Sequence, residues 1–72
     1  MFDKTLIGKN LNRIREAKGM TIETLAEKSN FTPRSVCNHV KNGISSVDTI
    51  FVYCEALGCE PADLFFLQGL EL

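Results

Sequence analysis

Residues 21–43 read TIETLAEKSNFTPRSVCNHVKNG. This stretch contains two signals for the start of a helix. Thr21 precedes an apolar stripe at helical spacing and has an acidic residue in the turn that follows it, which is typical of an N-cap. Thr32 followed by Pro33 is the stronger signal, because a threonine hydroxyl caps free N–H groups and proline has no N–H to satisfy at the first helical position.

The same stretch also contains the signals that end these helices. Asn30 belongs to the few non-glycine residues that tolerate a left-handed backbone, so it can close the first helix and turn the chain. Asn42 and Gly43 stop the second helix. The stretch therefore predicts two short helices, at about residues 22–29 and 33–41, joined by a tight turn as in a helix-turn-helix.

Outside this stretch the sequence also predicts helices. Apolar residues spaced i, i+4 and i+7 predict a first helix at about residues 4–18, Ser46 caps a fourth, and Pro61 opens a short fifth. The stripe expected to be buried in the fourth helix consists of Val47, Ile50, Phe51, Cys54 and Leu57. No segment alternates with period two, so we expect an all-α, five-helix fold that forms a single domain over residues 1–72.

The helix at about residues 33–41 has two different faces. At about 100° per residue, Val36 and Val40 point in nearly the same direction, towards the core. Arg34, Asn38 and Lys41 share the opposite face. Arginine can donate two bonds to guanine and asparagine can pair with adenine, whereas lysine at the far end is better suited to phosphate. The outer face is thus predicted to read a DNA major groove.

Charge is distributed unevenly along the chain. The first 43 positions hold eight basic and four acidic residues, a net charge of +4, and the remaining 29 hold five acids and no base. The net charge of −1 therefore hides a basic segment and an acidic one. We expect the basic segment to face phosphates.

From residue 7 to residue 65 the ordered motifs resemble the Cro and phage-repressor (XRE-type) helix-turn-helix family. The matching motifs are Leu11-x-x-Ile14-Arg15-x-x-Lys18-Gly19-Met20-Thr21, Leu25-Ala26, Thr32, Val36, Asn42-Gly43, Ser46-Val47-Asp48-Thr49-Ile50, Ala56-Leu57-Gly58 and Asp63-Leu64-Phe65. The resemblance implies a five-helix domain that binds operator DNA as a dimer and reads it with helices two and three. We expect a transcriptional regulator, a repressor, whose partner is double-stranded DNA.

The candidate DNA contacts follow from the resemblance and from the helix faces together. The resemblance implies that Pro33, Arg34 and Asn38 lie near bases and that Thr21, Thr32 and Asn42 lie near phosphates. From its position on the helix, Cys37 flanks the base-reading face, and Lys41 is assigned to phosphate.

In four places the sequence departs from the family pattern, one of them Val52, an apolar residue where the family often has lysine. Ile22 replaces a common glutamine, which weakens one expected contact with the phosphate backbone of DNA. Lys41 replaces a glutamate whose usual partner matches Arg15, so Arg15 is expected to find another acid or to face solvent. The interval from the second cap to Asn-Gly is one residue longer than is common, so either His39 or Val40 takes the second core position, and Val40 fits the apolar face better.

The acidic half carries more apolar residues than so small a domain easily buries. Candidate residues for a homodimer contact are Val52, Phe66, Leu67 and Leu70. The alternative is a fifth helix folded wholly against its own core. The missing glutamine and the apolar tail also leave open a protein-interaction module of the same fold, resembling an antitoxin or a regulatory subunit, with weak or no DNA binding.

Other classes of protein find little support. The acids are scattered and no glycine-rich phosphate loop occurs, so we expect no enzyme, no cofactor and no small-molecule ligand. Three cysteines without a Cys-x-x-Cys pair indicate neither disulfides nor zinc, although oxidation of Cys37 remains a hypothesis. With no signal peptide and no apolar run of about 20 residues, a cytoplasmic protein is expected.

Overall fold

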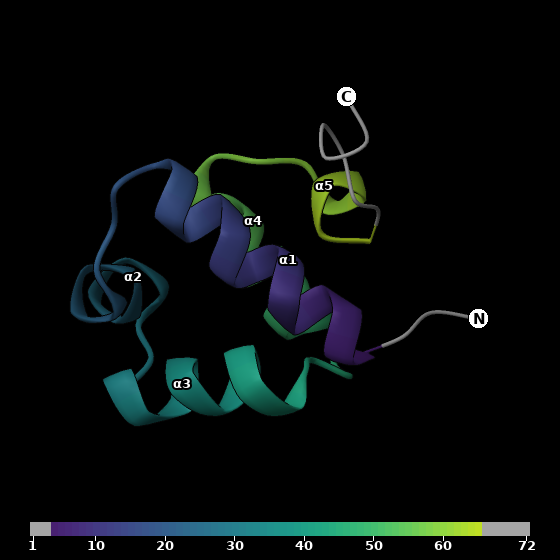
Figure 1. Ribbon diagram of the computed structural model, residues 1–72, viewed down its shortest axis with the longest axis horizontal. Helices are drawn as coiled ribbons and strands as arrows, with labels where there is room; N and C mark the ends of the chain where they lie inside the picture. Colours follow the sequence, from purple (N-terminus) through teal and green to yellow (C-terminus); the bar gives the residue numbers. More distant parts are fainter. Residues whose placement is uncertain (1–3, 66–72) are drawn as a thin grey trace.

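The computed structural model describes residues 4–65, and this part of the chain forms five helices and no strand. They are α1 (Lys4–Ala17), α2 (Ile22–Ser29), α3 (Pro33–Asn42), α4 (Val47–Leu57) and α5 (Pro61–Phe65). α3 lies along one edge of the molecule, and α2 and α5 lie towards opposite ends (Figure 1). The predicted all-α, five-helix fold is confirmed.

The predicted capping residues explain where the helices begin. In each of three cases a side-chain hydroxyl accepts a hydrogen bond from the backbone N–H three residues further on, at 3.0 to 3.4 Å. The three residues are Thr21, Thr32 and Ser46. Asn30 has a φ of 64° and ends α2 in the left-handed conformation. These caps place α2 and α3 on either side of a short turn, which fits the predicted helix-turn-helix.

The core is made of side chains from all five helices and from the segment between α3 and α4. Its buried apolar residues are Ile7, Leu11, Leu25, Ala26, Val36, Ile44, Ile50, Tyr53, Cys54, Leu57 and Leu64. α1 packs against α3 and α5, and α2 packs against α3 and α4. α3 is therefore held mainly by α1 and α2.

The buried stripe predicted for α4 is partly wrong. Val47 and Phe51 are 56% and 54% exposed, whereas Tyr53, which was left out of the stripe, is fully buried. The buried face of α4 is centred on Ile50, Tyr53 and Leu57 at spacings of three and four residues. A tyrosine ring buries a large apolar area, and its hydroxyl finds a partner in the core, so this rotation of the helix is favoured.

Arg15 finds another acid, Glu16, which is one of the two predicted outcomes, and it also bonds a side chain of α1 and a carbonyl of the loop that follows. Its side chain is only 13% exposed and donates to the Oδ1 atom of Asn12 and to the carbonyl of Met20. Glu16 lies 3.6 Å away. Arg15 thus satisfies a carbonyl in the loop between α1 and α2, and the absence of a glutamate on α3 does not leave it unpaired.

Candidate nucleic-acid interface

The outer face of α3 is formed as the helical spacing predicts. Val36 is fully buried under α3, while Arg34, Cys37 and Asn38 are exposed. All eight predicted DNA-contact residues lie at the surface. They are Thr21, Thr32, Pro33, Arg34, Cys37, Asn38, Lys41 and Asn42. Six of them belong to α3 and the two threonines cap α2 and α3, so they form the surface around one helix-turn-helix unit.

The hydroxyls of the two capping threonines are already engaged within the chain. Thr21 Oγ1 accepts from the N–H of Thr24 at 3.0 Å and lies 2.9 Å from its Oγ1 atom. Thr32 makes the same pair of contacts with Ser35, both at 3.1 Å. A phosphate at these helix ends would therefore meet backbone N–H groups of the first turn, as helix N-termini offer.

The second core position under α3 is shared by His39 and Val40. Val40 packs against the core cluster as expected. On the other side of Val36, the Nδ1 atom of His39 lies 2.6 Å from the hydroxyl of Tyr53 in α4. Helical geometry places His39 and Val40 on either side of Val36, so both residues can face the core.

Phe31, in the turn between α2 and α3, completes an aromatic cluster with His39 and Tyr53. The ring centroids are 5.2 to 5.5 Å apart, in edge-on or tilted arrangements that aromatic pairs prefer. Sequence reasoning missed this cluster. The sequence shows an aromatic residue in the turn and another on α4, but nothing in their spacing indicates that residues so far apart in the sequence are in contact.

Burial keeps the polar groups of this cluster uncharged at neutral pH. It lowers the pKa of His39 below its ordinary value of 6.5 and raises the pKa of Tyr53. The phenol therefore keeps its proton and can donate to the neutral imidazole.

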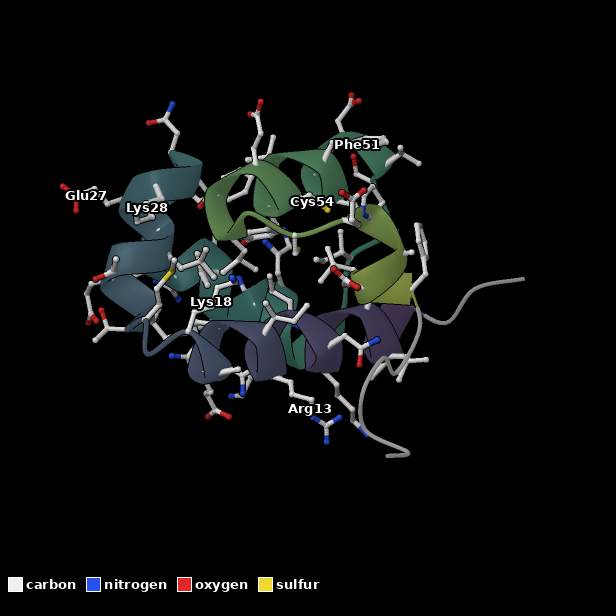
Figure 2. All side chains as sticks on the ribbon, turned by 90° about the horizontal axis from the view of Figure 1, so that it is seen from above. Arg13, Lys18, Glu27, Lys28, Phe51 and Cys54 are labelled. Atoms are coloured by element: carbon white, nitrogen blue, oxygen red, sulfur yellow. The ribbon has the colours of Figure 1, made fainter. Side chains whose placement is uncertain are left out.

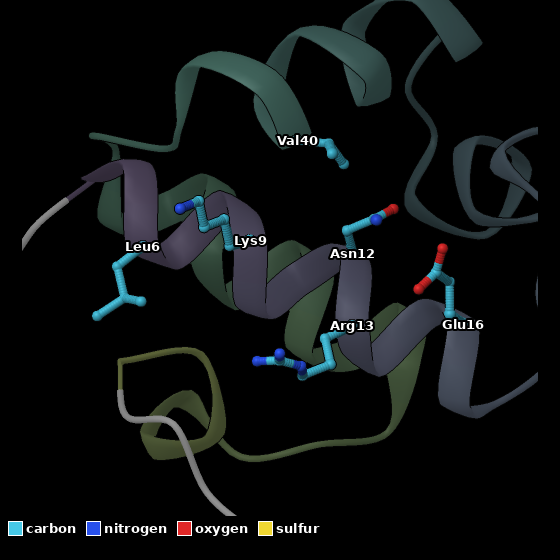
Figure 3. Close-up of a pocket in the computed structure, with 6 residues that line it drawn as sticks. All are labelled: Leu6, Lys9, Asn12, Arg13, Glu16 and Val40. Carbon is cyan, nitrogen blue, oxygen red and sulfur yellow. The ribbon is translucent and has the colours of Figure 1, made fainter. Parts of the chain in front are cut away.

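An open groove of about 450 Å³ runs between α1 and α3 (Figure 3). Its lining residues are Leu6, Lys9, Asn12, Arg13, Glu16 and Val40. The charges along it are mixed, since Lys9 and Arg13 are cationic and Glu16 is anionic. The basic residues of the chain are spread over α1, the loop after it, α2 and α3, and α3 contributes Arg34 and Lys41 to the exposed surface.

The outer side of α4 carries exposed apolar residues together with two exposed acids, Asp48 and Glu55. Val52 is 36% exposed and lies next to Phe51, which, with Val47, is more exposed still. Figure 2 shows Phe51 at the outer edge of α4 and Arg13 at the outer edge of α1, on opposite sides of the molecule. The other dimer candidates, Phe66, Leu67 and Leu70, lie outside the described residues.

The three cysteines differ in exposure. Cys37 is exposed on α3, whereas Cys54 is buried and Cys59 is half-buried near the end of α4. Burial raises the pKa of Cys54 to about 12 and also raises that of Cys59. Within residues 4–65 no three His, Cys, Asp or Glu side chains come together as a metal site would require. Nor is any helix in that range long and apolar enough to cross a membrane.

Comparison with known proteins now gives this arrangement a family. The sequence model of the Cro/C1-type helix-turn-helix DNA-binding domain matches residues 10–68. The chain therefore belongs to this family, which confirms the expected resemblance. No curated protein matches the chain.

Solved structures agree with this assignment. The restriction-modification controller protein C.AhdI from Aeromonas hydrophila is 33% identical, with a TM-score of 0.80 over 88% of this chain and 97% of that one. The clp gene regulator ClgR from Corynebacterium glutamicum is 29% identical, with a TM-score of 0.80 over 85% and 80%. The controller C.Esp1396I, 24% identical with a TM-score of 0.75 over 85% and 80%, shares the fold. The chain is a DNA-binding regulator of the helix-turn-helix class, a family of regulators and not of enzymes.

Proposed function

We propose that this chain is a sequence-specific transcriptional regulator that inserts α3 into the major groove of operator DNA. The observation that carries the proposal is the division of α3 into a buried side at Val36 and an exposed side at Arg34 and Asn38. A major groove is about 12 Å wide and admits one α-helix. The exposed side carries two of the side-chain types that pair bidentately with bases.

Within this proposal the residues have distinct roles. Arg34 and Asn38 read base edges, with Pro33 and Cys37 in apolar contact beside them. The groups assigned to phosphates are Lys41 and Asn42 at the end of α3 and the helix starts at Thr21 and Thr32. Phosphate contacts fix the register and make affinity depend on salt, while base contacts supply the sequence preference.

We further propose that the protein, a single domain over residues 1–72, acts as a homodimer and as a repressor. The exposed apolar side chains Val47, Phe51 and Val52 support a contact between copies through α4. Two copies of α3 would then meet half-sites about one helical turn, roughly 34 Å, apart. Bound across a promoter, such a dimer excludes the polymerase. The similarity to a restriction-modification controller and to a clp gene regulator supports a regulatory role.

Selection of bound DNA from random oligonucleotides tests this function. The expected result is a short, palindromic motif with half-sites about 10 base pairs apart. A reporter with that motif placed across its promoter should lose expression when the protein is present. A folded preparation that enriches no motif would overturn sequence-specific binding, and a rise in reporter expression would overturn repression.

The same exposed apolar side chains of α4 favour one alternative, a protein-interaction module with weak DNA binding. Salt dependence separates the two functions. DNA affinity should fall steeply between 50 and 200 mM salt because phosphate contacts release counterions. Binding dominated by an apolar interface to a protein should be nearly independent of salt over that range.

A further inference from the structure

The hydrogen bond between His39 and Tyr53 connects the reading helix to α4. Tyr53 is fully buried and comes from the centre of α4, whereas His39 is half-buried on α3. The two side chains meet at 2.6 Å, and Phe31 packs against both rings. α3 packs mainly on α1 and α2, so this cluster adds contacts to α3 from a further helix, α4, and from the turn before α3.

His39 directly follows Asn38, which is assigned to base reading. At about 100° per residue, its side chain projects well away from those of Arg34 and Asn38. A bond at His39 therefore resists rotation of α3 about its own axis, the movement that would swing both reading side chains across the groove floor. Val36, at the centre of the buried side, anchors the helix by apolar packing, which is not directional.

We propose that Tyr53 and Phe31 fix the rotation of α3 through His39, which makes His39 a positioning residue for base readout by Arg34 and Asn38. This inference rests on the proposed function of α3. Bidentate contacts tolerate errors of only about 0.5 Å and 10–20°. Contacts to phosphates from flexible side chains tolerate more, so loss of the cluster affects sequence discrimination before it affects general DNA affinity.

The chemistry of the pair suits this role. Tyr53 keeps its proton, and a buried phenol requires an acceptor. The neutral imidazole of His39 supplies one at Nδ1. When Tyr53 is changed to phenylalanine, the ring and its packing remain and the half-buried His39 can bond water instead. The domain should therefore stay folded while the link between α4 and α3 is lost.

The test uses the full-length protein and four variants. Tyr53→Phe and His39→Leu break the hydrogen bond, whereas His39→Asn retains an oxygen acceptor close to the position of Nδ1. Cys54→Ala is the matched control, because it removes a buried atom of α4 next to Tyr53 without touching α3. For each variant, affinity is measured for the selected operator and for scrambled DNA, and thermal unfolding confirms that the protein is folded at the assay temperature.

For Tyr53→Phe and His39→Leu we expect the ratio of operator to scrambled affinity to fall about tenfold, the effect of losing one bidentate contact. Affinity for scrambled DNA and the salt slope should stay unchanged. His39→Asn should retain most of the ratio, and Cys54→Ala all of it. An unchanged ratio in Tyr53→Phe, or an equal loss in Cys54→Ala, would overturn the inference. If the wild-type protein binds operator and scrambled DNA equally well, that result contradicts the proposed function of α3 and not the positioning role of His39.

Discussion

Gly8 of α1 lies directly against the backbone of α3 at His39. A Cβ atom on Gly8 would stand less than 3.0 Å from the carbonyl oxygen of His39 and from that of Val40. Only a residue without a side chain permits this approach. The backbone of α1 therefore packs directly against the backbone of α3 in its last turns. Close by, the N–H of Ile44 donates a hydrogen bond of 3.1 Å to the carbonyl of Lys4 at the start of α1.

Substitution of Gly8 by alanine should destabilise the fold. The clash is with backbone atoms, which cannot rotate away, so a cost of about 1–3 kcal/mol is expected for this overpacking. Urea denaturation followed by circular dichroism measures it. Gly19→Asn is the matched control, because Gly19 has nothing within 4 Å and a φ of 69° that asparagine tolerates. Equal stability of Gly8→Ala and the wild type would contradict the contact.

Arg34 and Asn38 should carry sequence preference, whereas Lys41 should not. Replacing Arg34 or Asn38 by alanine should reduce discrimination at one base pair of the operator by about 1–3 kcal/mol. Lys41→Ala should weaken all DNA sequences equally and reduce the salt slope by about one. Competition binding against single-base operator variants, repeated at several salt concentrations, distinguishes these patterns. A loss of affinity in Arg34→Ala that is uniform over all sequences would reassign Arg34 to phosphate.

The sequence predicted the helices well because their ends depend on local chemistry. Asn30 and the capping hydroxyls act within three residues of themselves, so their effect can be read from neighbouring positions. The exposed side of α3 was likewise predictable, because helical periodicity alone separates Val36 from Arg34 and Asn38.

The error in the buried side of α4 concerns a contact between residues distant in the sequence. Tyr53 is buried because His39, fourteen residues away, offers its hydroxyl a partner, and periodicity within α4 could not reveal this. For Arg15 the search for another acid was predictable and Glu16 supplies it, but the bond to the carbonyl of Met20 in the α1–α2 loop was not. Buried polar groups bond the partners that the fold places near them, and the spacing of residues in the sequence does not specify these partners.

Stability should fall as the pH decreases below 6.5, because of His39. Its folded pKa lies below the ordinary value of 6.5, since burial disfavours the charged form. Below that value the unfolded chain takes up a proton more readily than the folded one, so stability is full above pH 6.5 and is lost as the pH falls towards the folded pKa. Thermal melting of the wild type and of His39→Asn, which does not titrate, tests this. The same slope in both proteins would exclude His39 as its source.

If Val47, Phe51 and Val52 of α4 form the contact between copies, a charge among them should separate the copies. Phe51→Glu is expected to yield a monomer in light scattering after gel filtration, because an unpaired carboxylate would be buried in the interface. The side chain is 54% exposed in the single chain, so folding should be unaffected. Lys9→Glu on α1 changes an exposed charge away from α4 and should leave the oligomeric state unchanged. A dimer that survives Phe51→Glu would place the contact elsewhere.

Alkylation of the cysteines offers a direct test of how α3 meets DNA. Cys37 is exposed on α3 beside Asn38, so in the free protein it should react with iodoacetamide fastest, while Cys54, with a pKa raised to about 12, should react slowest. Insertion of α3 into the groove would cover Cys37 and slow its alkylation at least about tenfold at saturating operator. The half-buried Cys59 lies in the α4–α5 segment and serves as the internal standard, since its rate should not change. Mass spectrometry of the three cysteine peptides follows the rates, and a Cys37 that reacts equally fast with and without bound operator would show that α3 does not enter the groove.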